Sequence, residues 1–527
     1  MKHTVINRTW IFLIGLISLC TVSSCKKEIT NLIQPAEPGA PPVITGFTPD
    51  ASWYNQIVEI NGNNFSTELS ENTVTIGRVK AEMLEASTTR LKVRLTPETT
   101  DGYIHVKTNG QEVISTRQLV INQLAWQKTL GGSARDIATG IYPAGSGYFV
   151  VGYTESKDGD ITAPNAGSSD MWFAKLDSAR HIVWQRSLGG MAADYSVAGA
   201  PAVDGSFFIT GYSYSTDGDF KGGLGFSDIW VIKVDGNGAV LWKKPFGGTI
   251  DEQPASIIIA PDGGCVVAGY TYSKDGDVKG QHGSEDMWVI KLNAAGNLVW
   301  QKTLGSTGQD LASAIALDAD GGYLVAGSTN GKDGDVTNPM GDWDIWVVKL
   351  NSSGGLVWQK TVGGNDMDGS YAITATPDGG SAVAGFTWSK NGDVTNAHVG
   401  SEMWVVKLNA SGRLSWQKTI GGGGSETLYA IAATDDDGYV VAGHTNSNDG
   451  DIKGNHGSQD LWIAKINADR TITGQRTIGG SLAESLSSMS VAPDNGYLLA
   501  GFTGGSTDGD VTDPHGGTDM WVLKVWE

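Results

Sequence analysis

A motif that ends in tryptophan returns at a fixed spacing through most of the chain and strongly limits its fold. An acidic residue, one apolar residue and the tryptophan recur every 58 residues, with a final interval of 59. The tryptophans are Trp172, Trp230, Trp288, Trp346, Trp404, Trp462 and Trp521. A repeat of this length indicates one supersecondary unit per period, so the region from residue 124 onward is an array of similar units.

One period, residues 310–362, divides into four short strands joined by glycine-rich turns. The segments DLASAIALD, GYLVAGST, DIWVVKL and LVWQKTV are typical of strands, and a long loop separates the second from the third. The third strand is apolar on both faces, with Trp346 and Val348 on one face and Val347 on the other. Such a strand needs cover on both sides, which the neighbouring blades of a β-propeller provide.

The two ends of the array predict a closed ring. A second series, with glycine in its seventh place, marks the fourth strand of each unit at Trp126, Trp184, Trp242, Trp300, Trp358, Trp416 and Gly474. The array begins with a lone fourth strand at 124–130 and finishes on a third strand at 519–527. The first strand can therefore complete the last blade, which gives seven blades and no free edge. An open solenoid would leave the missing final strand unexplained.

The repeat itself resembles those of propeller-forming surface and secreted bacterial proteins. These proteins carry tandem units of the type WQKSLGG, DGGYIVAGYT, DGDV and DxWVVKL, and the resemblance covers residues 124–527. It implies the architecture but fixes no activity, because propellers host many functions.

The start of the chain predicts a lipoprotein leader. A basic beginning precedes a short apolar run from Trp10 to Leu19, which is too short to span a bilayer. The segment Val22-Ser23-Ser24-Cys25 resembles the bacterial lipobox, and this resemblance implies that residues 1–24 are a signal peptide and that Cys25 is lipidated. Cys20 is the competing cysteine, but a bulky leucine precedes it. A plain secretory signal is the alternative interpretation.

Residues 25–41 are polar and proline-rich, which is typical of a tether. We expect the anchored protein to lie at the outer membrane, and the sequence leaves open whether it faces the cell surface or the periplasm. Outside the leader, no apolar stretch of the sequence is long enough to cross a membrane.

A first small domain is predicted over residues 42–122. Short alternating runs such as IVEI, TVTI and LKVRL lie between turn clusters, which indicates an antiparallel sandwich. The motifs at Gly46-Phe47, Gly62-Asn63-Asn64-Phe65 and Gly102-Tyr103-Ile104 resemble the IPT/TIG family of immunoglobulin-like domains. The resemblance implies a spacer. The chain is therefore expected to be all-β, with an immunoglobulin-like sandwich before the propeller at 124–527.

Composition narrows the classes of partner. The 73 glycines suit a chain that turns often, and the formal net charge is −20. A field of this sign repels phosphate backbones, so nucleic acid is excluded as a partner, while cations and basic groups are favoured. The three cysteines cannot form a disulfide framework, and Cys265, in the apolar run GGCVVAGY, is predicted to be a buried core residue. We expect a monomer.

Each long loop carries a DGD-like motif. Two carboxylates separated by a glycine can chelate calcium, although the EF-hand spacing is absent and calcium needs six or more oxygens. The alternative, favoured because the motif repeats, is that each aspartate binds backbone N–H groups and fixes the loop. The candidate residues are Asp158, Asp160, Asp217, Asp219, Asp275, Asp277, Asp333, Asp335, Asp393, Asp449, Asp451, Asp508 and Asp510. Calcium is thus the one cofactor that the sequence suggests.

A second acidic series opens the first strand of each unit. Its members are Asp136, Asp194, Glu252, Asp310, Asp368, Glu426 and Glu484. Because the first strand of a blade is innermost, we expect these carboxylates to ring the mouth of the central channel. There they would hold a cation, or else bind backbone groups or the repeated lysine of the third strand.

The best functional clue is a position at which the repeats differ. Three residues after the second-strand glycine, the units carry Glu155, Tyr214, Tyr272, Asn330, Trp388, Asn446 and Gly504. Exposed aromatic side chains stack on sugar rings and anchor partner proteins, although loop packing explains them as well. The candidate ligand-binding residues are Tyr214, Tyr272, Trp343 and Trp388.

The sequence favours a non-catalytic binding or adhesion module, with a glycan or a protein as its ligand. A propeller hydrolase or lyase acting on polysaccharide would need an acid and base set in one blade, and most acids here recur around the ring. His282, His398, His456 and His515 lie in equivalent loops, so they are interpreted as repeat residues and not as a metal site. A purely structural envelope protein is the third possibility.

Overall fold

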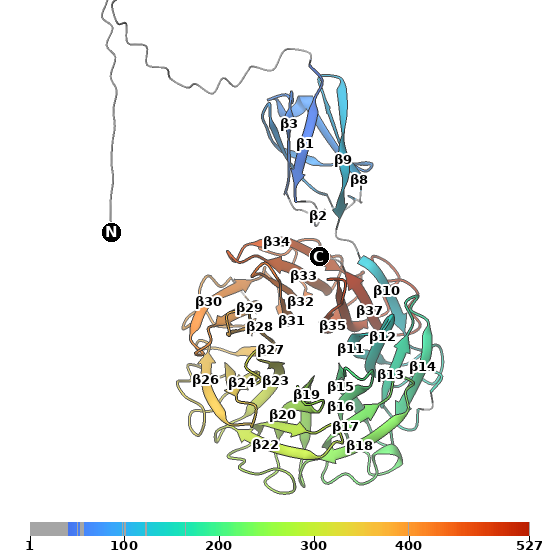
Figure 1. The fold of residues 1–527 in the computed structure, drawn as a ribbon, viewed down its shortest axis with the longest axis vertical. Helices are drawn as coiled ribbons and strands as arrows, with labels where there is room; N and C mark the ends of the chain where they lie inside the picture. Colours follow the sequence, from blue (N-terminus) through green and yellow to red (C-terminus); the bar gives the residue numbers. More distant parts are fainter. Residues whose placement is uncertain are drawn as a thin grey trace, which may run out of the picture. The chain divides into compact units, whose positions relative to one another are not determined.

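The computed structural model describes residues 40–49, 51–52, 57–96, 99, 102–121, 124–163, 165–398 and 400–525 (Figure 1). The predicted signal peptide, Cys25 and all but the end of the predicted tether lie outside these residues. The described chain forms β-strands and two short 3-10 turns, η1 (Leu69–Glu71) and η2 (Gly218–Phe220). None of its helices has the length and apolar character that a membrane span requires.

The first domain is a β-sandwich. Its strands are β1 (Val43–Thr48), β2 (Ala51–Ser52), β3 (Ile57–Asn63), β4 (Asn72–Ile76), β5 (Val79–Lys80), β6 (Glu82–Ala86), β7 (Arg90–Arg94), β8 (Gly102–Thr108) and β9 (Gln111–Ile121). They form two sheets, in the orders β1-β3-β7-β6 and β2-β9-β8-β4-β5. Alternate residues such as Ile60, Leu91 and Val106 are buried in one shared core, as the alternating runs predict.

Seven four-stranded sheets make up the propeller, and we call the strands of each blade A to D in order. Blade 1 is β11 (Asp136–Ala144), β12 (Gly147–Thr154), β13 (Asp170–Leu176) and β14 (Ile182–Leu188); blade 2 is β15 (Asp194–Pro201), β16 (Phe207–Ser213), β17 (Asp228–Val234) and β18 (Val240–Phe246); blade 3 is β19 (Glu252–Ile259), β20 (Cys265–Thr271), β21 (Asp286–Leu292) and β22 (Leu298–Leu304).

The remaining blades follow the same order. Blade 4 is β23 (Asp310–Leu317), β24 (Tyr323–Thr329), β25 (Asp344–Leu350) and β26 (Leu356–Val362); blade 5 is β27 (Asp368–Ala375), β28 (Ser381–Thr387), β29 (Glu402–Leu408) and β30 (Leu414–Ile420); blade 6 is β31 (Glu426–Ala433), β32 (Tyr439–Thr445), β33 (Asp460–Ile466) and β34 (Ile472–Ile478). Blade 7 is β35 (Glu484–Val491), β36 (Tyr497–Thr503), β37 (Asp519–Val525) and β10 (Leu124–Leu130). In Figure 1 the A strands line the inside of the ring and the D strands its outside.

The ring closes as the sequence predicts. Strand β10 pairs antiparallel with β37, and its register places Trp126 opposite Lys524. The indole Nε1 of Trp521 also donates to Oε1 of Gln127 at 2.7 Å. The fourth strand of the last blade is therefore supplied by the segment that precedes the first blade.

The repeated tryptophans hold neighbouring blades together. Trp346 of strand C is fully buried in a cluster with Val266 and Met287 of the preceding blade. Its Nε1 donates to Oε1 of Gln359 in its own strand D at 2.8 Å, which explains the glutamine of the WQK motif. On the outer strand, Nε1 of Trp358 donates to the carbonyl oxygen of Ala410 in the next blade at 3.2 Å. The strand-C tryptophan of a unit therefore packs against the preceding blade, and the strand-D tryptophan binds the next blade.

The long B–C loops gather on one face of the propeller. In blade 1 the strand pairings set the start of strand A opposite the end of strand B, and that end opposite the start of strand C. The B–C and D–A connections therefore share a face, which we call the long-loop face, and the short turns lie opposite. Cys265 is fully buried in strand B, as expected, and burial raises its thiol pKa to about 12.

Candidate functional site

The acidic series of strand A lies inside the blade junctions. All seven side chains are buried. In blade 2, Oδ2 of Asp194 accepts the backbone N–H of Gly190 at 2.8 Å and the hydroxyl of Ser215 at 2.9 Å, while Ser213 donates to Oδ1. Of the two alternatives, the contact with backbone groups is confirmed, because the carboxylate is buried and satisfies the glycine-rich D–A connection.

The repeated lysine of strand C has a different partner from the one considered above. Nζ of Lys291 lies 2.6 Å from Asp262, and Nζ of Lys407 lies 2.7 Å from Asp378. Both aspartates sit in A–B turns, on the face opposite the long loops. These lysines therefore pair with turn carboxylates and not with the acids that open strand A.

A second buried acid opens strand C and faces the acid of the next strand A. Oδ1 of Asp519 and Oδ2 of Asp136 lie 2.4 and 2.8 Å from the point where a Cβ on Gly131 would sit. Burial raises the pKa of Asp136, and the charge of Asp519 adds to the effect. Burial likewise raises the pKa of Asp228 to about 6. In five blades the strand-C Oδ1 is buried without a hydrogen-bond donor in the described chain, at Asp170, Asp228, Asp344, Asp460 and Asp519.

The first aspartate of the DGD motif binds the preceding D–A loop. Oδ1 of Asp275 accepts the N–H of Thr249 at 2.8 Å, and Oδ2 accepts the hydroxyl of the same residue at 2.9 Å. The glycine between the two carboxylates has positive φ, +64° at Gly276, and a Cβ there would lie 2.3 Å from the carbonyl oxygen of Gly247. The second aspartate, Asp277, has Oδ2 3.4 Å from the N–H of Gly247. Backbone binding is thus the observed role.

Within the described chain, no three or more histidine, cysteine, aspartate or glutamate residues are grouped so that they could hold a metal ion, and this includes the DGD motifs. The rings of His282, His398 and His456 contact the acid that opens strand C, whereas Nε2 of His515 lies 3.4 Å from Oδ2 of Asp160. Nδ1 of His282 lies 2.9 Å from Asp286, and Nδ1 of His456 lies 3.0 Å from Asp460, which raises the His456 pKa. These contacts agree with their interpretation as repeat residues.

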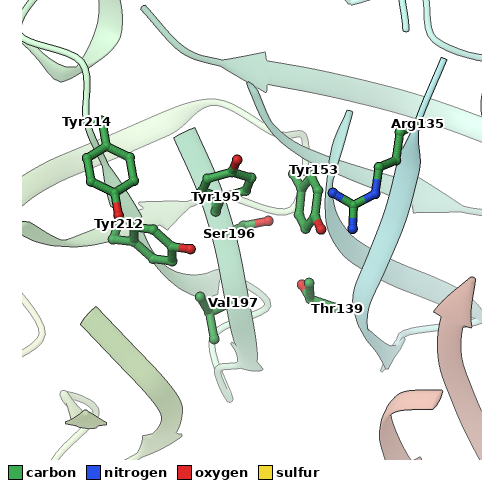
Figure 2. A pocket seen from close by; sticks show the side chains of 8 residues that line it. All are labelled: Arg135, Thr139, Tyr153, Tyr195, Ser196, Val197, Tyr212 and Tyr214. Carbon is green, nitrogen blue, oxygen red and sulfur yellow. The ribbon is translucent and has the colours of Figure 1, made fainter. Parts of the chain in front are cut away.

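A pocket at strands A and B of blades 1 and 2 breaks the repeat (Figure 2). Its volume is about 460 Å³, within the range of small-molecule sites. The lining residues are Arg135, Thr139, Tyr153, Tyr195, Ser196, Val197, Tyr212 and Tyr214. We call it the tyrosine pocket. It lies toward the long-loop face, because Tyr153 and Tyr212 stand one residue before the ends of their B strands.

The tyrosine rings form a continuous series. The centroids of Tyr153 and Tyr195 are 4.9 Å apart with the rings perpendicular, and those of Tyr195 and Tyr212 are 5.2 Å apart. Tyr214 meets Tyr212 edge to face at 5.7 Å. Edge-to-face and tilted contacts of this kind hold aromatic rings in fixed orientations. The pocket is therefore walled by ordered aromatic surface.

The series continues into blade 3 through one glutamine. Oε1 of Gln253 accepts the hydroxyl of Tyr270 at 2.7 Å, and its Nε2 lies 3.4 Å from the hydroxyl of Tyr214. Tyr270 meets Tyr272 edge to face, and the hydroxyl of Tyr272 donates to Glu285. Of the four predicted ligand-binding residues, Tyr214 lines the pocket and Tyr272 lies at this far end of the series.

Burial favours the protonated hydroxyls of Tyr153, Tyr212 and Tyr214. It raises the pKa of Tyr153, and it raises that of Tyr212 further, with help from the neighbouring tyrosines. It also raises the pKa of Tyr270 to about 12. These groups therefore act as hydrogen-bond donors and acceptors near neutral pH and not as general bases.

The other two predicted residues, Trp343 and Trp388, lie together at blades 4 and 5. Trp343 forms a parallel bridge with Met367, and the N–H of Trp388 donates to the carbonyl oxygen of Met367 at 2.9 Å. The Trp388 and Met367 side chains are 48% and 45% exposed. The structure thus divides the four aromatic candidates between two places on the long-loop face.

The pocket residues Arg135, Tyr153, Tyr195 and Tyr212 escaped the sequence analysis, although a signal for them exists. The strand-B position of Tyr153 is occupied in later blades by Tyr212, Tyr270, Ser328, Phe386, His444 and Phe502. This position is tyrosine in the first three blades and varies in the other four. Such a difference between repeats is the kind of signal that identified Tyr214. It was missed because an aromatic residue within a strand is usually core.

A comparison with protein families identifies the first domain. Residues 42–119 match the family model of the IPT/TIG domain, which confirms the resemblance noted for the first domain. The regulatory protein FlaEY of Caulobacter vibrioides is 28% identical over 377 residues, which are 63% of this chain but only 38% of that protein.

Solved structures are also similar to this chain at low sequence identity. An auxiliary nutrient binding protein of Bacteroides ovatus is 12% identical, with 94% of this chain and 100% of that chain covered and a TM-score of 0.31. Sqt1 of Chaetomium thermophilum is 14% identical, with 76% and 100% covered and a TM-score of 0.39.

Proposed function

We propose that this chain is a non-catalytic binding protein of the bacterial envelope, and that the tyrosine pocket on the long-loop face holds a glycan. The observation that carries the proposal is the aromatic lining of the pocket, which the repeat does not explain. Hydrogen-bonding acids recur in every blade and serve the scaffold, whereas four ordered tyrosine rings meet around a cavity at blades 1 and 2.

The chemistry of the lining suits a sugar ring. Aromatic faces pack against the C–H surface of a pyranose, and tyrosine hydroxyls can exchange hydrogen bonds with its hydroxyl groups. In the described chain, the hydroxyls of Tyr153, Tyr195 and Tyr212 have no hydrogen-bond partner within the protein. They are therefore available to a ligand.

The same lining supports binding over catalysis. The ionisable groups among its residues are one arginine and four tyrosines, and burial raises the pKa of Tyr153, Tyr212 and Tyr214. A glycosidase of the usual kind needs two carboxyl groups across the scissile bond, and none lines this pocket.

A glycan array with the purified full-length protein tests the proposal. Binding should be lost on Tyr195→Ala and Tyr212→Ala and kept on Tyr371→Ala, a matched change at the stacked pair Tyr371–Tyr429 of blades 5 and 6. Thermal melts verify that each variant is folded. Loss on Trp388→Ala instead would move the site to blades 4 and 5, and an array without hits would overturn the glycan ligand and favour a protein partner.

Attachment to the membrane through Cys25 is part of the proposal and rests on the lipobox-like segment. Metabolic labelling with a radioactive fatty acid should mark the wild-type protein and spare Cys25→Ala. Label that persists in this variant would contradict the anchor at Cys25. Digestion of intact cells by an added protease then distinguishes the cell surface from the periplasmic face.

A further inference from the structure

We propose that the tyrosine pocket selects glycans that carry a carboxylate, such as uronic acids, and that Arg135 is the residue that pairs with it. This inference rests on the proposed function and names the ligand class of that same site. It starts from one feature, a lone guanidinium at the rim of an aromatic pocket in a protein of net charge −20.

Arg135 occupies a position that no other blade fills with a cation. The residue just before strand A is Arg135 in blade 1, and in the later blades it is Ala193, Asp251, Gln309, Met367, Ser425 and Ala483. The repeat therefore does not require arginine here. A structural role common to all blades cannot explain it.

The backbone of Arg135 is fixed while its side chain is free. Its carbonyl oxygen accepts the N–H of Glu155 at 2.9 Å, and it forms a parallel bridge with Thr518 of blade 7. The side chain is exposed, and its guanidinium carbon lies 5.7 Å from the centre of the Tyr153 ring. Figure 2 shows the guanidinium beside that ring, at the edge of the pocket. Attraction to the ring face favours this position.

The guanidinium also lacks an ionic partner. In the described part of the chain Arg135 makes no ion pair within 4.0 Å, whereas Arg476 pairs with Asp510 at 2.9 Å. The carboxylate of the adjacent Asp136 is buried and accepts hydrogen bonds from Gly132 and Ser156, and that of Glu155 accepts one from the hydroxyl of Ser169 at 3.1 Å. An arginine presents a planar fork of donors that matches a carboxylate in two parallel hydrogen bonds. Arg135 is thus ready to receive one.

The charge pattern gives the bound ligand a direction. At the opposite end of the tyrosine series the equivalent residue is Asp251, whose charge contributes to the raised pKa of Tyr214 and of Tyr272. Oδ1 of Asp251 accepts the hydroxyl of Ser227 at 2.9 Å. A uronate should therefore place its carboxylate at blade 1 and its neutral hydroxyl groups toward blade 3, because the reverse orientation would set two carboxylates together.

Matched ligands separate this inference from the proposed function. Titration calorimetry of the full-length protein would use tri-galacturonate, tri-mannuronate and tri-glucuronate, each beside its carboxyl-reduced neutral form. At least one acidic trimer should bind, and carboxyl reduction should weaken its binding by roughly 10- to 100-fold, the usual value of a hydrogen bond to a charged group. Raising the salt concentration should weaken the binding of the acidic trimer and leave that of its neutral form unchanged.

Variants locate the effect at one side chain. Arg135→Gln should weaken the binding of the acidic trimer by about the same factor as carboxyl reduction does. It should leave the binding of the neutral form unchanged. The affinity of Arg135→Lys for the acidic trimer should lie between those of the wild type and Arg135→Gln, because a lysine ammonium keeps the positive charge but lacks the planar pair of donors. The control is Arg180→Gln, since Arg180 also lies over an aromatic ring, that of Trp126 at 5.8 Å, but outside the pocket.

Each remaining outcome decides the matter. Equal binding of acidic and neutral trimers, or an equal loss of both on Arg135→Gln, would overturn the carboxylate inference and leave a neutral-glycan site standing. Preference for a sulfated glycan over every uronate would also overturn it. Failure of all six trimers, with hits for other glycans on the array, would reject the uronate class, and failure on the array as well would reject the proposed function itself.

Discussion

The blade junctions and the tyrosine pocket lie a few residues apart along the same strands, yet they use polar side chains in opposite ways. At a junction, the carboxylate of Asp194 is buried and receives three hydrogen bonds from its own blade and the preceding D–A connection. In the pocket next to it, the hydroxyl of Tyr195 is partly exposed and has no protein partner in the described chain. The first arrangement occurs in all seven blades and the second in two.

This contrast shows how to separate scaffold from site in a repeat protein. A residue present in every unit is explained by the contact that every unit must make, and here that contact joins one blade to the next. A residue present in one or two units has to be explained by something that occurs once. The predictions below test whether stability follows the first set and binding the second.

The largest expected effect is on stability. Asp194→Ala removes the acceptor of one buried N–H and two hydroxyls, so it should lower the free energy of unfolding by about 3 kcal/mol or more. Urea denaturation measures it. The control is Asp366→Ala, an exposed carboxylate in the D–A connection before blade 5 that makes no ion pair or side-chain hydrogen bond in the described chain, so its removal should change the free energy of unfolding by less than about 1 kcal/mol. Similar losses in both variants would break the comparison.

A substitution in the pocket should lower ligand affinity and leave the stability of the protein unchanged. Tyr153→Phe keeps the ring and its edge-to-face contact with Tyr195 but removes the hydroxyl. We expect glycan affinity to fall about fivefold, equivalent to roughly 1 kcal/mol, with an unchanged unfolding midpoint. Calorimetry and a urea titration of the same preparation give both values. A stability loss without an affinity loss would return this tyrosine to the scaffold.

Acidification should stabilise the propeller over a limited range. Burial, opposed by hydrogen bonds and reinforced by Glu252 and Asp277, gives Asp228 a pKa of about 6 against an ordinary 3.8. The folded state therefore binds the proton more tightly than the unfolded state, and stability should rise as the pH falls from 7.5 to 5. Asp228→Asn should flatten this rise in thermal melts, while Asp262→Asn, at an exposed turn, should not. A midpoint that falls over this range would contradict the assignment.

The smallest expected effect concerns calcium. Both carboxylate oxygens of Asp275 and of Asp333 already accept hydrogen bonds from the N–H and hydroxyl of a threonine. Removal of divalent ions with EDTA should therefore leave the unfolding midpoint unchanged. A clear drop that calcium alone restores would show that the DGD motifs bind the ion, and it would make the repeated residues a site as well as a scaffold.

The architecture could be predicted closely from the sequence because each of the seven blades carries the same motifs. Within the unit at 310–362, strands C and D have the bounds read from the sequence, Asp344–Leu350 and Leu356–Val362. The seven-fold count and the closing strand followed from the order of motifs, and the backbone role of the DGD carboxylates followed from their recurrence.

The direction of individual side chains was harder to predict. The sequence left open whether the acid that opens strand A holds a cation or binds backbone groups, since strand position alone does not tell whether a terminal side chain turns inward or back toward the preceding loop. Tyr214 was identified because it stands in a loop, but Tyr195 and Tyr212 stand in strands, where aromatic residues usually fill the core. Their convergence on Arg135 depends on contacts between two blades, which periodicity within one unit does not contain.

The pairing of β10 with β37 has a consequence for the time course of folding. Trp521 and Gln127, which share a hydrogen bond, stand 394 residues apart in the sequence. An exported chain enters the envelope N-terminal end first, so the first strand is present long before its partner and stays unpaired while the intervening blades form. Contacts of such sequence separation form slowly, so ring closure should be the last step of folding. Until then both edges of the array are open to other chains, and this interval is when the protein most needs a chaperone.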